Sequence, residues 1–197
     1  ESRGLGDVYK RQVQAPTGVG KTMSAIFPSV RAIGEGKGET LFYLTAKTIT
    51  GTVAQEAFHI LREKGLKFKV TAITAKEKLC FQDTPECTPE KCPYAKGHFD
   101  RVNDAVYELW TTEEVYSREV IRAHAEKWQV CPFEMCLDLS IWVDGIICDY
   151  NYVFDPNVHL KRFFGENISG DHIFLIDEAH NLVERGREMY SAGISRQ

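Results

Sequence analysis

The stretch Ala-Pro-Thr-Gly-Val-Gly-Lys-Thr at residues 15–22 decides the fold. It matches the phosphate-loop pattern, with Ala15 in the place of the usual first glycine. Gly18 and Gly20 allow the backbone to turn so that successive N–H groups point at phosphate oxygens. We expect Lys21 to reach the β- and γ-phosphates of ATP and the Thr22 hydroxyl to bind Mg²⁺. The other expected nucleotide-binding residues of this loop are Pro16, Thr17 and Val19.

Strand and helix signals alternate around this loop. Residues 13–14 are read as the end of a strand, and a helix is expected over 21–33 with a kink at Pro28. The runs 40–45 and 68–74 are typical of buried strands. Between them lies an apolar helical stripe, formed by Val53, Ala57, Ile60 and Leu61. This order predicts an α/β fold with a parallel sheet.

A second motif, Asp-Glu-Ala-His, follows the apolar run at 172–176. That run predicts a strand which delivers Asp177 and Glu178 at its carboxyl end, where ligands of open α/β sheets bind. Asp177 would hold Mg²⁺ together with Thr22, and Glu178 would polarise the attacking water. Two acids at a helix start also occur for purely structural reasons, because they interact with the helix dipole. Together with the phosphate loop, however, they predict a nucleotide hydrolase whose catalytic residues are Glu178, Asp177 and Lys21.

Residues 76–138 interrupt the alternating pattern. No strand is expected there, but helices are expected over 98–110 and 113–128. The pattern resumes with a short strand at 146–148 and a helix that begins at Asp155-Pro156. We therefore predict one α/β domain, made of residues 13–75 and 139–197, with an insertion at 76–138.

The insertion contains cysteines with the spacing C-x6-C-x4-C-x38-C, namely Cys80, Cys87, Cys92 and Cys131. Zinc sites usually use closer C-x2-4-C pairs, whereas four thiolates on a loop-rich segment also suit an iron–sulfur cluster. Buried free thiols are the third alternative. Cys136 is the one rival to Cys131, and Cys148 is expected to lie in the core.

Composition excludes some classes of protein. The chain has 197 residues, 43% of them hydrophobic, and a net charge of −4, so it is no polycationic nucleic-acid binder. No apolar run approaches the roughly 18 residues of a membrane helix, and no export signal opens the chain. Residues 1–12 are unusual, because residues 7–12 back-translate to a sequencing-adapter end. We expect residues 1–12 not to be native.

Three segments resemble one known family. Residues 177–182 (DEAHNL) resemble motif II of superfamily 2 helicases, and residues 44–48 (LTAKT) resemble motif Ia. The order of the four cysteines, and the segment 149–156 (DYNYVFDP), are similar to the XPD/DinG iron–sulfur helicases. The resemblance implies a RecA-like P-loop domain and a [4Fe–4S] cluster held by the four cysteines. In the family pattern a cysteine is followed by proline and an aromatic residue, which favours Cys131 over Cys136 as the fourth ligand. The resemblance also implies that His180 couples the nucleotide site to neighbouring motifs.

The implied function is an ATP-dependent DNA helicase of bacterial DinG type, acting in the cytoplasm at the nucleoid in DNA repair. It would move 5′-to-3′ on single-stranded DNA and open forks, with ATP, Mg²⁺ and the cluster as cofactors and no membrane partner. The resemblance also implies that a second motor domain is missing, so that this chain alone binds ATP weakly and does not unwind DNA. A DinG-like nuclease, and a non-catalytic zinc or redox module on a degenerate ATPase fold, are the alternatives.

Side chains of the insertion are candidate DNA contacts. The cationic candidates are Lys76, Lys78, Lys91, Lys96, Arg101, Arg118, Arg122 and Lys127. The aromatic candidates for stacking on bases are Phe81, Tyr94, Phe99, Tyr107, Trp110, Tyr116 and Trp128. Many acids lie among them, so the insertion is not a plain basic patch. Most of these aromatics are expected to pack in a core, with one or two left to stack on bases.

Overall fold

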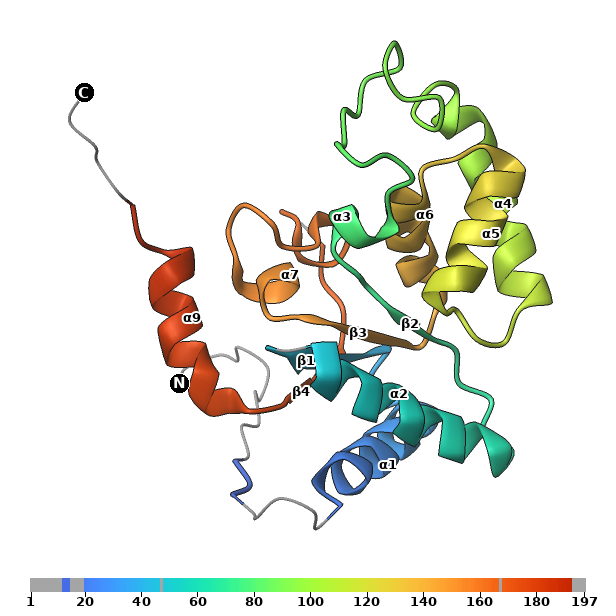
Figure 1. Ribbon diagram of the computed structural model, residues 1–197. Coiled ribbons are helices and arrows are strands. Elements are labelled where there is room, and N and C mark those ends of the chain that lie inside the picture. Colours follow the sequence, from blue (N-terminus) through green and yellow to red (C-terminus); the bar gives the residue numbers. More distant parts are fainter. Residues whose placement is uncertain (1–11, 15–19, 47, 167, 193–197) are drawn as a thin grey trace.

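The computed structural model describes residues 12–14, 20–46, 48–166 and 168–192. Its centre is a four-stranded parallel sheet with the order β2-β3-β1-β4 (Figure 1). The strands are β1 (Thr40–Thr45), β2 (Val70–Ala72), β3 (Gly145–Asp149) and β4 (His172–Ile176). The predicted α/β fold with a parallel sheet is confirmed. Because all four strands run the same way, their carboxyl ends meet at one edge.

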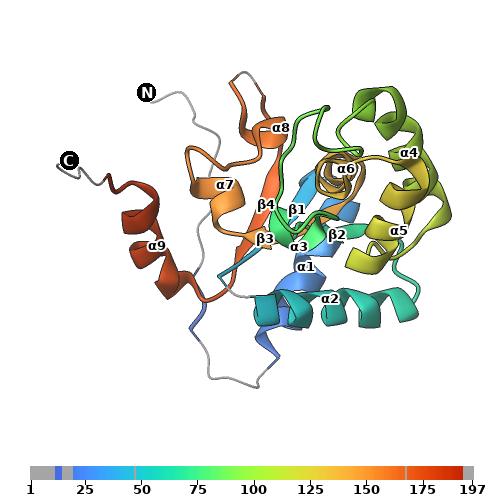
Figure 2. The same cartoon turned by 45° about the horizontal axis from the view of Figure 1, so that its top comes forward.

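Helices cover both faces of the sheet (Figures 1 and 2). One face carries α1 (Lys21–Gly34) and α2 (Thr48–Glu63). The other face carries the long helices of the insertion, α4 (His98–Thr112), α5 (Arg118–Trp128) and α6 (Pro132–Leu139). The shorter elements are α3 (Lys76–Leu79), η1 (Ser140–Trp142), α7 (Asn151–Phe154), α8 (Lys161–Phe164), η2 (Ala179–Asn181) and α9 (Leu182–Met189).

The alternation of side chains along β1 creates two cores, because successive residues of a strand point to opposite faces. Leu41 and Tyr43 belong to the core shared with α1 and α2. Phe42 and Leu44 belong to the core shared with the insertion. All four side chains are buried, so β1 is the central strand on which both layers pack.

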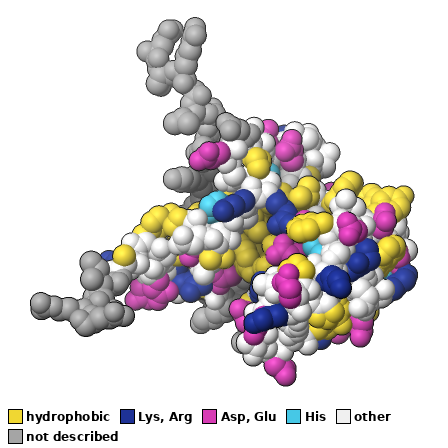
Figure 3. All heavy atoms as spheres, turned by 90° about the horizontal axis from the view of Figure 1, so that it is seen from above, with side chains coloured by type: hydrophobic (Ala, Val, Ile, Leu, Met, Phe, Trp, Pro, Cys, Tyr) yellow, Lys and Arg dark blue, Asp and Glu magenta, His cyan; other side chains and the backbone are white. Residues whose placement is uncertain are grey.

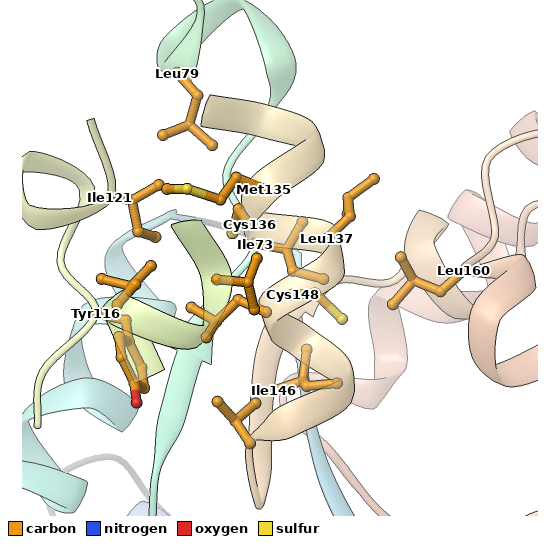
Figure 4. Packing of buried hydrophobic residues seen from close by; sticks show 14 of the residues in the cluster. Ile73, Leu79, Tyr116, Ile121, Met135, Cys136, Leu137, Ile146, Cys148 and Leu160 are labelled. Atoms are coloured by element: carbon orange, nitrogen blue, oxygen red, sulfur yellow. The ribbon is translucent and has the colours of Figure 1, made fainter. Parts of the chain in front are cut away.

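The insertion has no core separate from that of the sheet. Figure 4 shows Ile121 of α5 next to Met135 of α6, with Ile73 below them and Ile146 farther along the same cluster. All of these residues are buried in one continuous cluster. The helices of the insertion therefore form one layer of the α/β domain.

Several predicted elements differ from the structure. The helix predicted to begin at Asp155-Pro156 is wrong, since residues 155–159 form turns between α7 and α8. A residue before proline is pushed out of the helical region, and Asp155 is indeed extended, with φ −77° and ψ 122°. Its carboxylate accepts a hydrogen bond from the backbone N–H of Asn157 at 2.8 Å, which is a turn contact.

The insertion also contains helices that were not predicted, α3 and α6. Pro132 occupies the first turn of α6, where a proline is favourable. The helix predicted over 113–128 begins later, at Arg118, because the Ser117 hydroxyl caps it by accepting from the Val120 N–H at 3.2 Å. Strand β2 is shorter than the predicted strand 68–74. Helix α1 continues through Pro28 without a break.

Some sequence predictions lie outside the described residues. These include the adapter hypothesis for residues 1–11 and the loop residues Ala15, Pro16, Thr17, Gly18 and Val19. Within the part of the chain that the structure describes, no helix is long and apolar enough to span a membrane.

Candidate nucleotide site and cysteine layer

The end of the phosphate loop leads directly into helix α1. Gly20 has a left-handed backbone, with φ 77°, and its carbonyl accepts the first helical hydrogen bond from Ser24 N–H at 3.0 Å. A residue with a side chain would be strained there, whereas glycine is not. Lys21 and Thr22 therefore stand on the first turn of α1, at its positive end. This is the position in which a helix N-terminus binds phosphate.

Tyr43 connects that first turn to the acidic motif. Its hydroxyl donates a hydrogen bond to the Asp177 carboxylate at 3.0 Å and also hydrogen-bonds to the Thr22 side chain. Burial of Tyr43, followed by the negative charge of Asp177, raises the pKa of its phenol well above the usual value. The phenol is therefore neutral and can act as a donor. The predicted pair of magnesium ligands, Thr22 and Asp177, is thus held against one phenol.

Tyr150 holds the backbone of the acidic motif from the other side. Its hydroxyl donates to the carbonyl of Asp177 and, at 3.2 Å, to that of Glu178. Burial and the two nearby carboxylates raise the pKa of Tyr150 to about 12, so this hydroxyl also remains a donor. Tyr150 itself is fully buried behind β3. A buried side chain therefore holds the backbone of Asp177 and Glu178 in place.

Glu178 adopts a left-handed backbone, with φ 50° and ψ 44°. This conformation is uncommon for residues other than glycine, and such strain often accompanies function. The backbone N–H of Glu178 donates to Asp177 Oδ1 at 3.0 Å, and its carboxylate lies 3.4 Å from His180 Nδ1. Both side chains are largely exposed at the carboxyl edge of the sheet. Glu178 is thus open to a bound molecule.

An ion pair helps to attach helix α9 to this edge. The Arg185 guanidinium contacts both carboxylate oxygens of Asp149, at 2.9 and 3.0 Å, and Asp149 ends strand β3. The described part of α9 has no buried residue of its own. The Arg185–Asp149 contact therefore positions the segment that follows His180.

Sequence reasoning missed Tyr43, Tyr150 and the Arg185–Asp149 pair. For Tyr43 a signal exists, because its one polar side-chain atom stands in the middle of the strand, between Phe42 and Leu44. A buried tyrosine usually finds a hydrogen-bond partner for its hydroxyl. Which partner that would be depends on the pairing of β1 with β4, and the sequence does not show this pairing.

The four predicted cluster ligands lie at the start of the insertion and at its last helix. Cys80 follows α3 and its Sγ accepts from the Gln82 N–H at 3.4 Å, while Cys131 precedes α6. The Lys76 ammonium hydrogen-bonds to Cys87, and interaction with Cys87 and Cys131 raises the pKa of that lysine. Within the described residues, no three His, Cys, Asp or Glu side chains are grouped as ligands of a single metal ion.

The two remaining cysteines lie in the core. Cys148 is buried in β3, which agrees with the prediction for it. Cys136, the rival of Cys131, is completely buried on α6, with its Sγ 3.9 Å from the Thr71 hydroxyl. Burial raises the pKa of the Cys136 thiol to about 11. Cys136 therefore points at the sheet, whereas Cys131 is only half-buried at the helix start.

Most of the side chains that were candidates for DNA contacts already contact other residues of this chain. Internal contacts are made by Lys76, Lys91, Arg101, Arg122 and Lys127. Among the aromatics, Tyr116 is buried, and Phe81 and Tyr94 pack on each other with ring centroids 4.5 Å apart. Phe99 and Tyr107 remain exposed. Figure 3 shows hydrophobic, acidic and basic side chains interspersed on the face that it views, without a continuous basic surface.

The family model DEAD_2 matches residues 59–197. A relative from Saccharomyces cerevisiae, the general transcription and DNA repair factor IIH helicase subunit XPD/RAD3, is 32% identical over 114 residues. That match covers 58% of this chain and 14% of the relative. The Fanconi anemia group J protein homolog of Gallus gallus is 28% identical over 89 residues, or 45% of this chain and 6% of the relative.

Solved structures share the fold. A chain described as truncated XPD superposes with a TM-score of 0.58 at 23% identity, covering 85% of this chain and 47% of that one. A second structure, described as an XPD helicase, gives a TM-score of 0.55 at 19% identity and covers 87% and 29% of the two chains. The RecA-like fold predicted from the sequence fits these neighbours. The chain spans less than half the length of each of these relatives and solved chains.

Proposed function

The chain belongs to the DEAD_2 family, and from this premise we propose that it forms the ATP-hydrolysing motor domain of an XPD-like DNA helicase. The proposal rests on the phenol of Tyr43, which hydrogen-bonds to Asp177 and lies close enough to Thr22 to interact with its side chain. A phosphate-loop threonine and an acidic-box aspartate are the protein ligands that Mg²⁺ uses in P-loop hydrolases. Here one buried side chain holds both.

In the proposed reaction, each residue of the site has a distinct role. Lys21 and the N–H groups at the start of α1 bind the phosphates, while Thr22 and Asp177 hold the Mg²⁺ that accompanies ATP. Glu178 takes the proton of the attacking water. His180, which contacts Glu178 at 3.4 Å, carries the state of the nucleotide site to neighbouring motifs.

The test is nucleotide hydrolysis by the full-length protein with Glu178→Gln. We expect the hydrolysis rate to fall about 100-fold or more while ATP binding is kept, because a general base contributes roughly 10²–10⁴-fold. Lys21→Ala should instead weaken ATP binding itself. The matched control is Glu184→Gln, an exposed acid on the first turn of α9. Unchanged hydrolysis in Glu178→Gln would remove the proposed base.

We further propose that hydrolysis drives 5′-to-3′ movement on single-stranded DNA and opening of forks, as the family resemblance implies. The family match and the names of the relatives support DNA as the polymer. Unwinding of forked duplexes with a 5′ or a 3′ single-stranded tail by the full-length protein tests the polarity. Opening of the 3′-tailed fork alone would contradict it.

A [4Fe–4S] cluster held by Cys80, Cys87, Cys92 and Cys131 completes the proposal. The donor set fits by residue type, because four cysteines are the usual ligands of such a cluster and the Lys76 ammonium lies beside Cys87 and Cys131. Among the described residues the four thiols are not gathered around one point, so the proposal includes their coming together when the cluster binds. When bound, the cluster would cross-link α3, the loop after it and α6.

Anaerobic reconstitution with iron and sulfide tests this assignment. We expect bound iron and broad absorbance near roughly 400 nm, as for thiolate-bound iron. Cys131→Ser should lose both signals, and Cys136→Ser, which alters a core thiol, should keep them. Loss of iron in Cys136→Ser with retention in Cys131→Ser would reverse the assignment, and stoichiometric zinc without iron would refute the cluster.

A further inference from the structure

An aromatic cavity is lined by residues of α4, α6 and η1. It has a volume of about 100 Å³ and is lined by Asn103, Val106, Tyr107, Trp110, Asp138 and Trp142. We infer that this cavity binds a lysine or arginine side chain of a partner protein. The inference goes beyond the proposed function and does not depend on it.

The cavity is preformed by a fixed pair of tryptophans. The indole N–H of Trp110 donates to the backbone carbonyl of Trp142 at 2.8 Å, which locks η1 against α4. The two ring centroids lie 6.2 Å apart with planes inclined by 53°, so the rings form an open wedge. Tyr107 adds a third ring, one helical turn before Trp110. A preformed site loses little conformational entropy when a ligand binds.

The chemistry of the walls selects a cation. Aromatic faces carry negative partial charge and attract ammonium and guanidinium groups, most strongly when the ring is Trp. Lys69 Nζ lies 5.1 Å from the Trp110 ring centroid, held by hydrogen bonds to the carbonyls of Trp110 and Glu113, and Lys69 does not line the cavity. Asp138 adds a carboxylate, and its Oδ1 accepts hydrogen bonds from Arg162 at 3.1 and 2.6 Å.

The surroundings of the cavity exclude nucleic acid and favour a basic protein. Residues 98–144 contain ten Asp or Glu against four Lys or Arg, so a phosphate backbone would be repelled. On α4, Asp100 and Asp104 are exposed and precede Tyr107 by seven and three residues, which places them beside it on the helix surface. The cavity is also well below the about 300 Å³ of common small-molecule sites. The cavity has room for the end of one lysine or arginine side chain.

The exposed aromatics extend this site into a docking face. Tyr107 and Trp142 are 66% and 59% exposed, and Phe99, two helical turns before Tyr107, is 86% exposed. Aromatic anchors of this kind are enriched in protein interfaces. A basic segment would place one cation in the cavity and apolar groups along α4.

The test uses the indole N–H signals of the ¹⁵N-labelled chain, which has three tryptophans. The probes are three short alanine peptides with lysine, arginine or norleucine at the centre, and oligothymidylate. We expect the Trp110 and Trp142 signals to shift with the two cationic peptides and about tenfold less with norleucine. Trp128, which bonds to Glu108 outside the cavity, should not shift. Equal shifts with norleucine, shifts with oligothymidylate in their place, or no shift at Trp110 and Trp142 would overturn the inference.

Variants provide the control on position. Trp142→Ala should abolish the response of the Trp110 signal, and the variant keeps the backbone carbonyl that Trp110 needs. Phe99→Ala, which removes an exposed ring outside the cavity, should leave the response unchanged. Loss of the response in Phe99→Ala but not in Trp142→Ala would place the binding elsewhere and refute the cavity. The wild-type titration remains decisive if Trp142→Ala does not fold.

Discussion

At the scale of single residues, two buried tyrosines organise the candidate nucleotide site. Tyr43 contacts the side chains of Thr22 and Asp177, and Tyr150 contacts the backbone at Asp177 and Glu178. Both phenols are shielded from water and face carboxylates, so their pKa values are raised and they remain hydrogen-bond donors throughout the physiological pH range.

Tyr43→Phe should weaken magnesium binding without removing a ligand. An outer-shell hydrogen bond to a metal ligand typically contributes about 10–100-fold in metal affinity or activity, so we expect roughly a tenfold loss of apparent Mg²⁺ affinity. Magnesium titration of nucleotide binding or hydrolysis in the full-length protein measures it. Tyr190→Phe removes a distant exposed hydroxyl and is the matched control. A Tyr43→Phe variant with unchanged magnesium dependence would contradict the bridging role.

The cysteines should differ sharply in reactivity. In the native, iron-free chain at about pH 8, we expect iodoacetamide to modify exposed Cys87 and half-buried Cys80, but not Cys136 or Cys148. Burial raises the pKa of the Cys136 thiol to about 11, so its reactive thiolate form is scarce below that pH. Mass spectrometry of digested peptides measures the modification. Labelling in guanidinium, which should modify all the cysteines, is the control, and rapid native labelling of Cys136 would contradict its core position.

At the scale of elements, the sheet depends on a close approach at the start of β3. A Cβ atom at Gly145 would lie 2.9 Å from the side chain of Phe68, which precedes β2, and 3.2 Å from that of Val70, the first residue of β2. The pairing of β2 with β3, and with it the attachment of the insertion to the sheet, needs a residue without a side chain there.

Gly145→Ala should therefore destabilise the domain. Overpacking costs about 1–3 kcal/mol, and each kcal/mol lowers Tm by about 2–4 °C for a domain of this size. Gly34→Ala is the control, because nothing lies within 4 Å of its added Cβ and alanine favours a helix end in α1. Thermal unfolding followed by circular dichroism compares the two. A neutral Gly145→Ala would mean that β2 and β3 separate easily.

At the scale of the whole molecule, both cores pack on one sheet, so the layers should unfold together. Ile26 of α1 is completely buried on the face opposite the insertion. All three tryptophans lie between residues 110 and 142, on the insertion side. Tryptophan fluorescence therefore reports on the layer that does not contain Ile26.

Ile26→Ala should lower the unfolding midpoint seen by tryptophan fluorescence as well as by far-UV circular dichroism. The expected loss is about 2–5 kcal/mol, as for other large-to-small core substitutions. Urea titration with both probes measures it, and Ser24→Ala, an exposed position on the same helix, is the control. If the two probes gave different midpoints, the insertion would be a separately folding unit.

Much of this arrangement was accessible from residue patterns, because strong local signals coincide with the elements. The runs at 40–45 and 172–176 are the observed strands, and α1 begins at Lys21 as predicted. Failures occurred where local and long-range preferences compete. Pro156 favours a helix start in isolation but restricts Asp155, and α6 is too short to show a clear period beside the cysteines.

The residue sequence alone determined the class of fold, and it supplied the phosphate-loop pattern, the acidic motif and the four-cysteine pattern on which the proposals rest. These features depend on residue type and spacing along the chain. The tertiary structure decided which side chains meet, because neighbouring strands of a parallel sheet come from distant segments of the chain. The pairing of β1 with β4 brings Tyr43 to Asp177, and the packing of η1 against α4 brings Trp142 to Trp110. No local pattern encodes those contacts.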